Sequence, residues 1–403
     1  MANREVLFVD GVRTPFGRAG EKGMYWKTRA DDLSVKTVRA LLERNPGLPA
    51  ERVDDVAIAA TTQQGDQGLT LGRTVGMLAG LPQSVPGLAI DRMCAGALTA
   101  ATTMGSGIAF GAYEVAIAGG VEHMGRHPLG GDADPNPRFV AERLVSQDAL
   151  NMGKTAERLH DRFPQLSRER ADRYGMRSQQ KAAAAYEAGL IQPDLVPVAI
   201  ESEAGWGLAT RDETLRPDTN MAALAELRTP FRPHGRVTAG NSSGLNDGAT
   251  ACLLASRDAV KAYGLSAPMR MVGFAFAGVE PEVMGMGPVP STEKALQRAG
   301  LKIDDIGLFE LNEAFAVQVL AFLDHFGIPD DDPSVNMWGG AIAIGHPLAS
   351  SGVRLMMQLA RQFRLHPEVR YGVTAMCVGL GQGGTIIWEN TNWNRKKHAR
   401  VRA

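Results

Sequence analysis

Two segments near the C-terminal end of the chain place proton-carrying side chains among glycines. His346 lies in the segment NMWGGAIAIGHP, residues 336–347, and Cys377 follows thirty-one residues later in the segment CVGLG, residues 377–381. Imidazole and thiol groups both exchange protons near neutral pH, and glycines leave room for a ligand to approach the backbone. The pattern therefore predicts acid–base chemistry against a bound substrate.

A second cysteine, Cys94, is placed as a nucleophile would be. Its surroundings, LAIDRMCAGA at 88–97, indicate the end of a strand followed by an alanine-rich helix. The free N–H groups and the positive dipole end of such a helix favour a thiolate. A lone cysteine at this kind of turn is more often a small buried side chain, so the interpretation depends on the other motifs.

An asparagine completes the set of side chains that can act on a carbonyl group. Asn312 stands in ELNEAFA at 310–316, directly after a predicted strand. Its amide can hold a water or a carbonyl oxygen, as an uncharged donor in an oxyanion hole does. An asparagine at a strand-to-helix turn caps the following helix about as often, and both roles stay open here.

The elements that must position these residues occur twice along the chain. The run VDDVAI at 53–58 recurs as IDDIGL at 303–308, in each case a helix end, an acidic turn and a buried strand. Downstream, the segment of Cys94 corresponds to 334–341, and a returning strand at 115–120 corresponds to 373–379. A duplicated α/β unit whose halves face each other brings Cys94 towards Cys377.

The composition limits the class of protein. With 403 residues, 44% of them hydrophobic, and 46 glycines, the chain fits an α/β protein of two or three packed units. The formal net charge of −1 gives no field that would attract nucleic acid or a membrane surface. No apolar run approaches the length of a membrane span, so neither kind of partner is expected.

The cysteines and the N-terminal residues indicate the compartment. Three cysteines, odd in number and far apart, argue against a disulfide framework, and their spacing makes no zinc site, so no metal is expected. The first residues run into the strand-like segment VLFV at 6–9 without room for a secretory signal. We therefore expect a cytoplasmic protein.

The chain divides into three predicted segments. Residues 1–120 together with 247–268 form the first α/β half, 269–403 form the second half, and 121–246 form an inserted loop domain with a different, more charged and proline-rich character. The basic run NRKKHARVR at 394–402 is expected to be a frayed, solvated tail.

At this point the chain resembles the thiolases, which make or cleave 3-ketoacyl thioesters of coenzyme A. The resemblance covers nearly the whole length, and its motifs are highly specific in combination. They are RTPFG at 13–17, Cys94, GGVEHM at 119–124, VTAGNSSGLNDG at 237–248, NEAF at 312–315, GHP at 345–347 and CVG at 377–379.

The resemblance implies a thiolase fold, in which two duplicated α/β halves pack as a five-layered αβαβα core with an inserted CoA-binding loop domain. It also implies a mechanism. His346 takes the proton of Cys94, which attacks the keto carbonyl, and Cys377 moves the proton to and from carbon and CoA. One oxyanion hole would combine His346 with a water held by Asn312, and the other the backbone N–H groups of Cys94 and Gly379.

The resemblance further implies a set of residues that contact coenzyme A, which acts as co-substrate while no cofactor is bound permanently. Arg216 would lie near the nucleotide, where its guanidinium can bind phosphate as a fork. The others would lie along the pantetheine and the acyl end: Phe231, Ala239, Ser243, Met152, Met284, Ala314 and Phe315. Expected partners are acyl-CoA and CoA, a second copy or three further copies of the chain, and a hydratase–dehydrogenase subunit.

Three positions near the nucleophile and the base depart from the family pattern, and so does Trp338. The family usually has Asn where Asp91 stands, Ser or Thr where Gly96 stands, and Gly where Ala349 stands. The carboxylate of Asp91 would oppose ionisation of a nearby thiol. Trp338 stands where a smaller residue is common, so it either narrows the pocket or fills the core.

The hypothesis that we favour is a degradative 3-ketoacyl-CoA thiolase, because GVEHMG at 120–125 and MGPVP at 286–290 resemble fatty acid oxidation members. The first alternative is a biosynthetic acetoacetyl-CoA thiolase. A decarboxylating ketoacyl synthase would need two histidines around the cysteine, where this chain has Asn312 and Cys377. A thiolase-like acyl-CoA-binding protein without catalytic activity is the remaining alternative.

Overall fold

The computed structural model describes residues 4–131, 133–203 and 205–393, in which ten strands form one continuous hydrogen-bonded sheet and β6 and β7 form a separate two-stranded sheet. The large sheet has two parts, which are called the first and the second sheet below. The first sheet has the order β4–β3–β5–β8–β1 and the second the order β9–β12–β11–β10, joined where β1 pairs with β9. Their bounds are β1 Val6–Arg13, β3 Asp55–Ala59, β4 Leu88–Ile90, β5 Val115–His123, β8 Asn246–Ser256, β9 Met269–Gly278, β10 Ile306–Leu311, β11 Tyr371–Val378 and β12 Gln382–Asn390.

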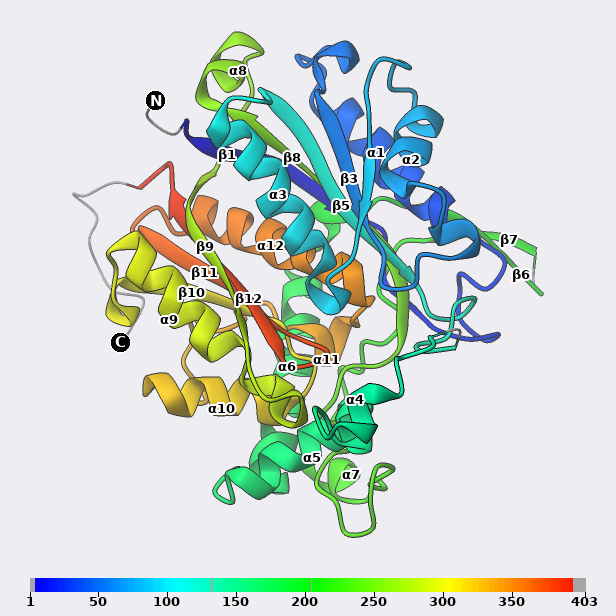
Figure 1. Ribbon diagram of the computed structural model, residues 1–403, viewed down its shortest axis with the longest axis vertical. Coiled ribbons are helices and arrows are strands. Elements are labelled where there is room, and N and C mark those ends of the chain that lie inside the picture. Colours follow the sequence, from blue (N-terminus) through cyan, green and yellow to red (C-terminus); the bar gives the residue numbers. More distant parts are fainter. Residues whose placement is uncertain (1–3, 132, 204, 394–403) are drawn as a thin grey trace.

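Helices cover both sheets and also fill the space between them (Figure 1). The outer layer of the first sheet contains α1 Ala30–Arg44 and α2 Leu71–Ala79, and that of the second sheet contains α9 Pro288–Ala299 and α10 Ala316–Phe326. The middle layer consists of α3 Gly96–Phe110 and α12 Ser351–Leu365. The predicted five-layered αβαβα core is thus confirmed.

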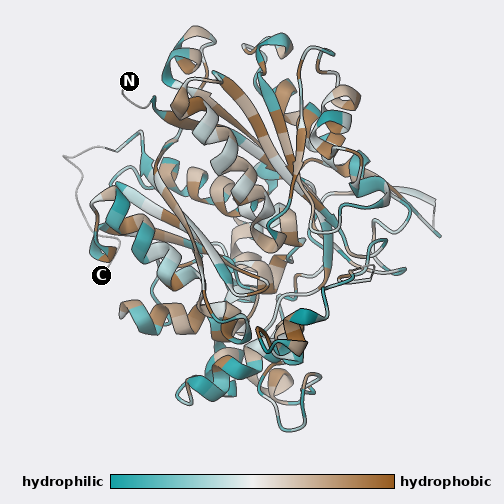
Figure 2. Ribbon diagram, viewed as in Figure 1, coloured by the Kyte–Doolittle hydropathy of each residue, from teal (hydrophilic) through white to brown (hydrophobic). Residues whose placement is uncertain are grey.

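The middle layer determines the composition of its helices. A helix that is covered by sheets on two sides has little exposed surface, and α3, GALTAATTMGSGIAF, consists almost entirely of small and apolar residues, whereas α12 contains the buried polar side chains of Arg354, Gln358 and Gln362. Small residues also let the two helices approach closely, since a Cβ atom on Gly352 of α12 would lie 2.4 Å from the backbone nitrogen of Leu98. Figure 2 shows brown along the strands and more teal on the outer helices.

The predicted repeat is visible in the pairing of the strands. The parallel pairs β3–β5 and β10–β11 are equivalent, and each is continued by antiparallel strands, β8–β1 in one half and β12–β9 in the other. The counterpart of β4 in the second half is reduced to one parallel bridge between Phe309 and Val335. Both repeats bring their loops to the same edge of the core, which is where Cys94 and Cys377 lie.

The segment between β5 and β8 forms the part drawn at the bottom and right of Figure 1. Its elements are α4 Arg138–Ala141, α5 Met152–Arg162, α6 Arg168–Glu187, β6 Val198–Ser202, β7 Gly205–Ala209 and α7 Met221–Ala225. The remaining short elements are β2 Gly17–Arg18, α8 Arg257–Ala262 and α11 Ala341–Ile344. The predicted start of the insert at 121 falls inside β5, and the three-segment division stays a prediction. The basic run 394–402 lies outside the described residues.

One stretch of the described chain, Met93–Phe110, is long and apolar enough to span a membrane by length and composition alone, and 67% of it is buried inside the molecule. The expectation that no apolar run approaches a membrane span is therefore wrong for this stretch. The physical reason is its place in the middle layer, because a core helix between two sheets needs the same apolar composition as a membrane helix.

Candidate active site

Cys94 lies in a strained turn between β4 and α3. It belongs to the 3-10 turn Met93–Ala95, and the preceding Met93 has a left-handed backbone with φ of +44°. The Asp91 carboxylate accepts a hydrogen bond from the Met93 N–H at 2.6 Å and so supports this turn. The placement at a strand end and a helix start agrees with the sequence, and Cys94 is partly exposed.

Burial outweighs the influence of the helix start on the ionisation of Cys94. Burial is the largest influence and raises the pKa of the Cys94 thiol to about 12. The backbone N–H groups of Gly379 and of Cys94 itself lower this pKa, whereas the negative charges of Glu122 and Asp91 raise it. The resting nucleophile is therefore a thiol, which must lose its proton to a base when it attacks.

Cys377 approaches Cys94 from the opposite half of the molecule. It lies at the end of β11 and is 1% exposed, and burial, with a smaller influence from Cys94, raises the pKa of its thiol. The loop after it contacts the turn of the nucleophile, since a Cβ atom on Gly379 would lie 2.5 Å from the Met93 sulfur. A side chain at 379 would displace the Met93 thioether, and the Gly379 N–H lies beside the Cys94 sulfur.

His346 is held on three sides by hydrogen bonds. It follows α11, and its backbone N–H donates to Asn246 Oδ1 at 2.9 Å. Its Nδ1 atom lies 2.6 Å from Ser351 Oγ, and its Nε2 atom lies 3.3 Å from Asn312 Nδ2. The side chain is buried, and this burial, together with the positive charge of Arg354, lowers the pKa of His346 to about 3. The imidazole is therefore neutral and able to accept a proton.

The two alternatives for Asn312 are now distinguished. The helix that follows, α10, begins at Ala316 with Phe315 as its capping residue and without a side-chain cap. The amide of Asn312 instead lies between His346 and Arg354, whose Nη2 atom donates to Asn312 Oδ1 at 3.2 Å. The asparagine is fully buried beside His346 and does not cap α10, and its role in an oxyanion hole stays a prediction.

Most of the residues predicted to contact coenzyme A share one hydrophobic core cluster with Cys377. One apolar cluster contains Cys377 with Met152, Phe231, Met284, Ala314 and Phe315. Ser243 joins it through hydrogen bonds from its N–H and Oγ to the Ala314 carbonyl, at 3.0 Å and 3.2 Å. Ala239 lies exposed on the same connection, four residues before Ser243.

Arg216 is separate from this cluster. It is exposed in the loop between β7 and α7, and its backbone N–H donates to Gln179 Oε1 at 2.8 Å. Gln179 in turn donates from Nε2 to the carbonyl of Ile342 at 3.2 Å, in the helix just before His346. The Arg216 guanidinium thus lies at the surface. Its loop is connected through Gln179 to α11, the helix that precedes His346.

Several residues near the site were missed by the sequence analysis. The fully buried Glu122 accepts hydrogen bonds from the N–H groups of Thr61 at 3.1 Å and Ala349 at 3.2 Å, and from Gln67 Nε2 at 3.1 Å. It therefore connects three loops around the nucleophile. Glu122 stands in the motif GGVEHM, but a glutamate in a strand gives no sign of what it will contact. Ser351 and Arg354 were missed as well.

The departures from the family pattern have a steric explanation in two cases. Gly96 packs against the turn that contains Ala349, and a Cβ atom on Gly96 would lie only 3.0 Å from the Ala349 Cβ. This chain has glycine at 96, where the family usually has Ser or Thr, and alanine at 349, where it usually has Gly. The smaller residue at 96 thus leaves room for the larger one at 349. Trp338 is 5% exposed and lies in a core cluster with Ala182 and Ile344, so it fills the core between α6 and α11.

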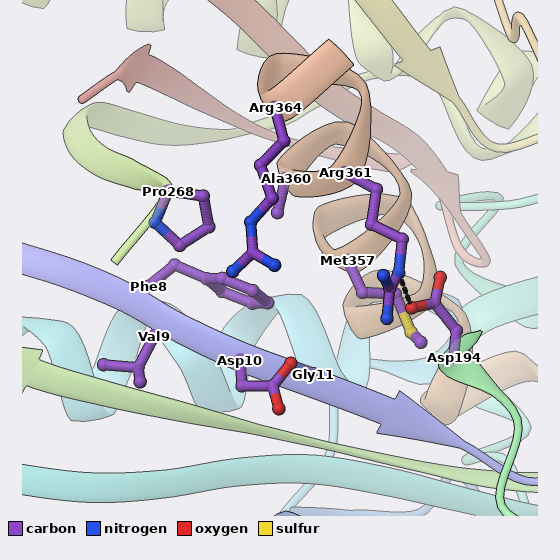
Figure 3. A pocket seen from close by; sticks show the side chains of 10 residues that line it. All are labelled: Phe8, Val9, Asp10, Gly11, Asp194, Pro268, Met357, Ala360, Arg361 and Arg364. Carbon is purple, nitrogen blue, oxygen red and sulfur yellow. Dashed lines mark hydrogen bonds and ion pairs between the residues drawn. The ribbon is translucent and has the colours of Figure 1, made fainter. Parts of the chain in front are cut away.

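A small pocket lies elsewhere along α12 (Figure 3). It is lined in part by Asp10, Asp194, Arg361 and Arg364, and Arg361 makes an ion pair with Asp194. Burial is the largest influence on Asp194 and raises the pKa of its carboxyl to about 6. None of the predicted site residues lines this pocket.

Comparisons with known proteins agree with this site. The family models described as "Thiolase, N-terminal domain" and "Thiolase, C-terminal domain" match residues 6–258 and 265–390. Beta-ketoadipyl-CoA thiolase of Pseudomonas putida is 43% identical, over 96% of this chain and 99% of that protein. 3-ketoacyl-CoA thiolase of Serratia proteamaculans is 42% identical, over 95% and 99%.

Solved structures give the same result. The crystal structure of human mitochondrial 3-ketoacyl-CoA thiolase has a TM-score of 0.87 and 35% identity, and covers 96% of this chain and 99% of that one. The same human enzyme in complex with CoA has a TM-score of 0.86 and 34% identity, over 96% and 98%. Sequence, strand order and the convergence of two cysteines and a histidine therefore agree, and the chain belongs to the thiolase family.

Proposed function

We propose that this thiolase cleaves 3-ketoacyl-CoA with a second molecule of CoA, giving acetyl-CoA and an acyl-CoA shortened by two carbons. The observation that carries the proposal is that Cys94 and Cys377 meet from opposite halves of the molecule, while Ala349, in the turn after His346, packs against Gly96, two residues after Cys94. A nucleophile, a base and a second proton carrier are the groups that this reaction needs.

In the first half of the reaction, Cys94 attacks the 3-keto carbonyl carbon while its proton passes to His346. The bond between C2 and C3 then breaks, and its electron pair stays on C2 as the enolate of acetyl-CoA. Cys377 donates its proton to C2, which leaves acetyl-CoA, a Cys377 thiolate and an acyl thioester on Cys94.

In the second half, the Cys377 thiolate takes the proton of the incoming CoA thiol. The CoA thiolate attacks the acyl thioester, and Cys94 leaves and regains its proton from His346. The N–H groups of Cys94 and Gly379, which both act on the resting sulfur, are available to the carbonyl oxygen of the acyl thioester. Loss of one donor of this kind typically raises the barrier by about 2.7 to 4 kcal/mol.

For the acyl group, we propose a chain longer than the four carbons of acetoacetyl-CoA. The methionine and phenylalanine side chains among the predicted CoA-contacting residues, which share one hydrophobic cluster with Cys377, support this choice, since such side chains favour apolar ligand surface. The names of the relatives, 3-ketoacyl-CoA thiolase and beta-ketoadipyl-CoA thiolase, support it as well. The second name indicates a six-carbon acyl group with a terminal carboxylate as a further candidate substrate.

The test compares CoA-dependent cleavage of 3-oxoadipyl-CoA, 3-oxohexanoyl-CoA and acetoacetyl-CoA. The first two have the same chain length and differ in the terminal carboxylate, so their ratio measures recognition of that charge alone. A higher kcat/KM for either six-carbon substrate supports the proposal. Preference for acetoacetyl-CoA would favour a biosynthetic thiolase instead.

The covalent step is tested separately with Cys94→Ala. We expect the intact mass of the wild type to increase by one acyl group after brief exposure to acyl-CoA, and the variant to show neither this adduct nor turnover. Unchanged turnover in Cys94→Ala would contradict the mechanism, and acyl-CoA binding without turnover in the wild type would indicate a binding protein.

We also propose a cytoplasmic location and a homodimer or homotetramer. All three cysteines are free, which supports a reducing compartment. The strand β4 ends the order of its sheet, its residues are only partly buried, and Phe110 and Leu69 are 87% and 86% exposed. A partner copy would cover such surface. Light scattering at several protein concentrations tests the assembly, and a monomer throughout would contradict it.

A further inference from the structure

Two side chains from the first turn of α12 reach the pair formed by His346 and Asn312. Ser351 lies on the Nδ1 side of the imidazole, at 2.6 Å, and Arg354, three residues later, donates from Nη2 to Asn312 Oδ1 at 3.2 Å. Residues three apart lie on one face of a helix, so a single rigid turn contacts both catalytic side chains. All four residues are buried.

The contact with Arg354 determines which way the asparagine amide faces. A guanidinium has five donors and no acceptor, so the amide atom that faces it must be the oxygen. The amide NH2 group of Asn312 then faces His346 Nε2 at 3.3 Å and donates to it. A nitrogen that accepts a hydrogen bond bears a lone pair, so the proton of the neutral imidazole is on Nδ1 and points to Ser351 Oγ.

We propose that Arg354 is a positioning residue for the reaction: it holds the Asn312 amide in this orientation and thereby reserves the His346 Nε2 lone pair for the proton of Cys94. The inference rests on the proposed function, because it takes His346 as the base. If the amide were turned over, its oxygen would face Nε2 and favour the tautomer with a proton there. That tautomer cannot accept the proton of Cys94.

The charge of Arg354 also keeps the resting imidazole neutral, because it lowers the pKa of His346. The side chain is 0% exposed, its Nη1 atom donates to Gln358 at 2.7 Å and lies 3.5 Å from Glu310, and its Nε atom has no hydrogen-bond partner among the described residues. Burial, the largest influence, raises the pKa of Glu310 to about 7, so this carboxyl compensates the arginine only in part near neutral pH. The other charges that act on Arg354 are those of Glu313, Arg13 and Asp212.

The test uses the full-length protein with Arg354→Met, and Arg364→Met as the matched control. Arg364 is an exposed arginine on the same helix, ten residues further, and it lies at the pocket of Figure 3. We expect Arg354→Met to lower kcat about 100-fold, as loss of a positioned base does, and to leave KM for CoA within about twofold. The control should keep the wild-type values.

The decisive readout is the tautomer of His346, measured in long-range 1H–15N spectra of protein with 15N-labelled histidine. The signals of His346 are assigned as those absent in His346→Asn. We expect a protonated Nδ1 in the wild type and in the control, and a protonated Nε2 in Arg354→Met. A wild type with a protonated Nε2, or an Arg354→Met protein that keeps the wild-type tautomer, would overturn the proposal.

A second variant covers the case in which Arg354→Met does not fold. Asn312→Asp keeps the size of the side chain and an acceptor for Arg354, but a carboxylate can only accept from His346. We therefore expect a protonated Nε2 in Asn312→Asp, and an unchanged tautomer would again overturn the proposal. Arg354→Lys keeps the positive charge and a group that only donates hydrogen bonds, so it should keep the wild-type tautomer and part of kcat. The spectra report on Arg354 even if the wild type does not cleave 3-ketoacyl-CoA, which separates the two failures.

Discussion

The contact between Gly96 and Ala349 joins the segment of Cys94 to the segment of His346. It gives a quantitative prediction for the stability and the activity of variants at these two positions. Gly96 begins α3, directly after the turn of Cys94, and Ala349 lies in the 3-10 turn Leu348–Ser350, directly after the segment of His346. A Cβ atom on Gly96 would lie 2.7 Å from Ala59 Cβ and 3.0 Å from Ala349 Cβ. Carbon atoms pack best at about 3.5 to 4.0 Å, so both neighbours would have to move.

The expected cost of Gly96→Ala follows from these distances. Overpacking of a well-filled core costs about 1 to 3 kcal/mol, and the better helix propensity of alanine offsets at most about 1 kcal/mol. We therefore expect the free energy of unfolding to fall by about 1 to 2 kcal/mol. Ala349→Gly in the same protein removes one of the two crowded atoms, so the double variant should be about 0.5 to 2 kcal/mol more stable than the sum of the single changes predicts.

The assay is urea unfolding of the wild type, the two single variants and the double variant, at one protein concentration, together with kcat. A displacement of about 1 Å at a catalytic group can cost about 100-fold in rate, so we expect kcat of Gly96→Ala to fall and that of the double variant to recover in part. Gly76→Ala is the matched control, since this buried helical glycine has no neighbour closer than 3.4 Å to an added Cβ. Additive effects of the two changes, or a cost of Gly96→Ala no larger than that of the control, would refute the reasoning.

Three further predictions concern charges. Asp91→Asn keeps an oxygen that accepts from the Met93 N–H, but it removes a negative charge that raises the pKa of Cys94. Alkylation of Cys94 by iodoacetamide should therefore begin at lower pH, and an unchanged pH profile would contradict this. The pKa of His346 is lowered from 6.5 to about 3 in the folded protein, so only the unfolded chain binds this proton between those values, and stability falls as the pH falls through that range. His346→Asn should therefore lose about 2 kcal/mol less stability than the wild type between pH 7.5 and pH 5 in urea unfolding, and equal losses would speak against a buried neutral imidazole. Arg13→Met leaves the carboxylate of Asp212 buried without its bidentate partner, so thermal and urea unfolding should show a loss of about 3 to 5 kcal/mol, and a loss below about 1 kcal/mol would show that the pair is not needed.

The fold could be predicted because its signals are local and occur twice. The acidic turn before β3 and the one before β10 are each followed by a buried strand, and each pair of parallel strands needs a helix to cross between them. Hydrophobic runs identified these strands without knowledge of their neighbours. The weaker strand of the second half, which is only the bridge between Phe309 and Val335, has no such run.

The ionisation of Cys94 could not be predicted because it depends on groups that are distant in sequence. The start of α3 favours a thiolate, and the sequence shows that feature. The opposing influences are burial by the other half of the molecule and the charge of Glu122, which is brought near by pairing of β5 with β3. A local sequence pattern shows in which direction one group shifts the pKa of a cysteine, but it does not show the combined effect of all the groups that surround it in the fold.

The same limit applies to the residues that orient the base, and it explains why the motifs alone do not define the site. His346 and Asn312 were identified from their types, but neither type determines which imidazole nitrogen bears the proton. That choice depends on Ser351 and Arg354, which lie on a helix of the middle layer and face the site only because α12 packs between the two sheets. A change that keeps every motif but tilts the first turn of α12 would leave Cys94 in place and without a base, so the middle layer is as much a part of the active site as the residues that contact the substrate.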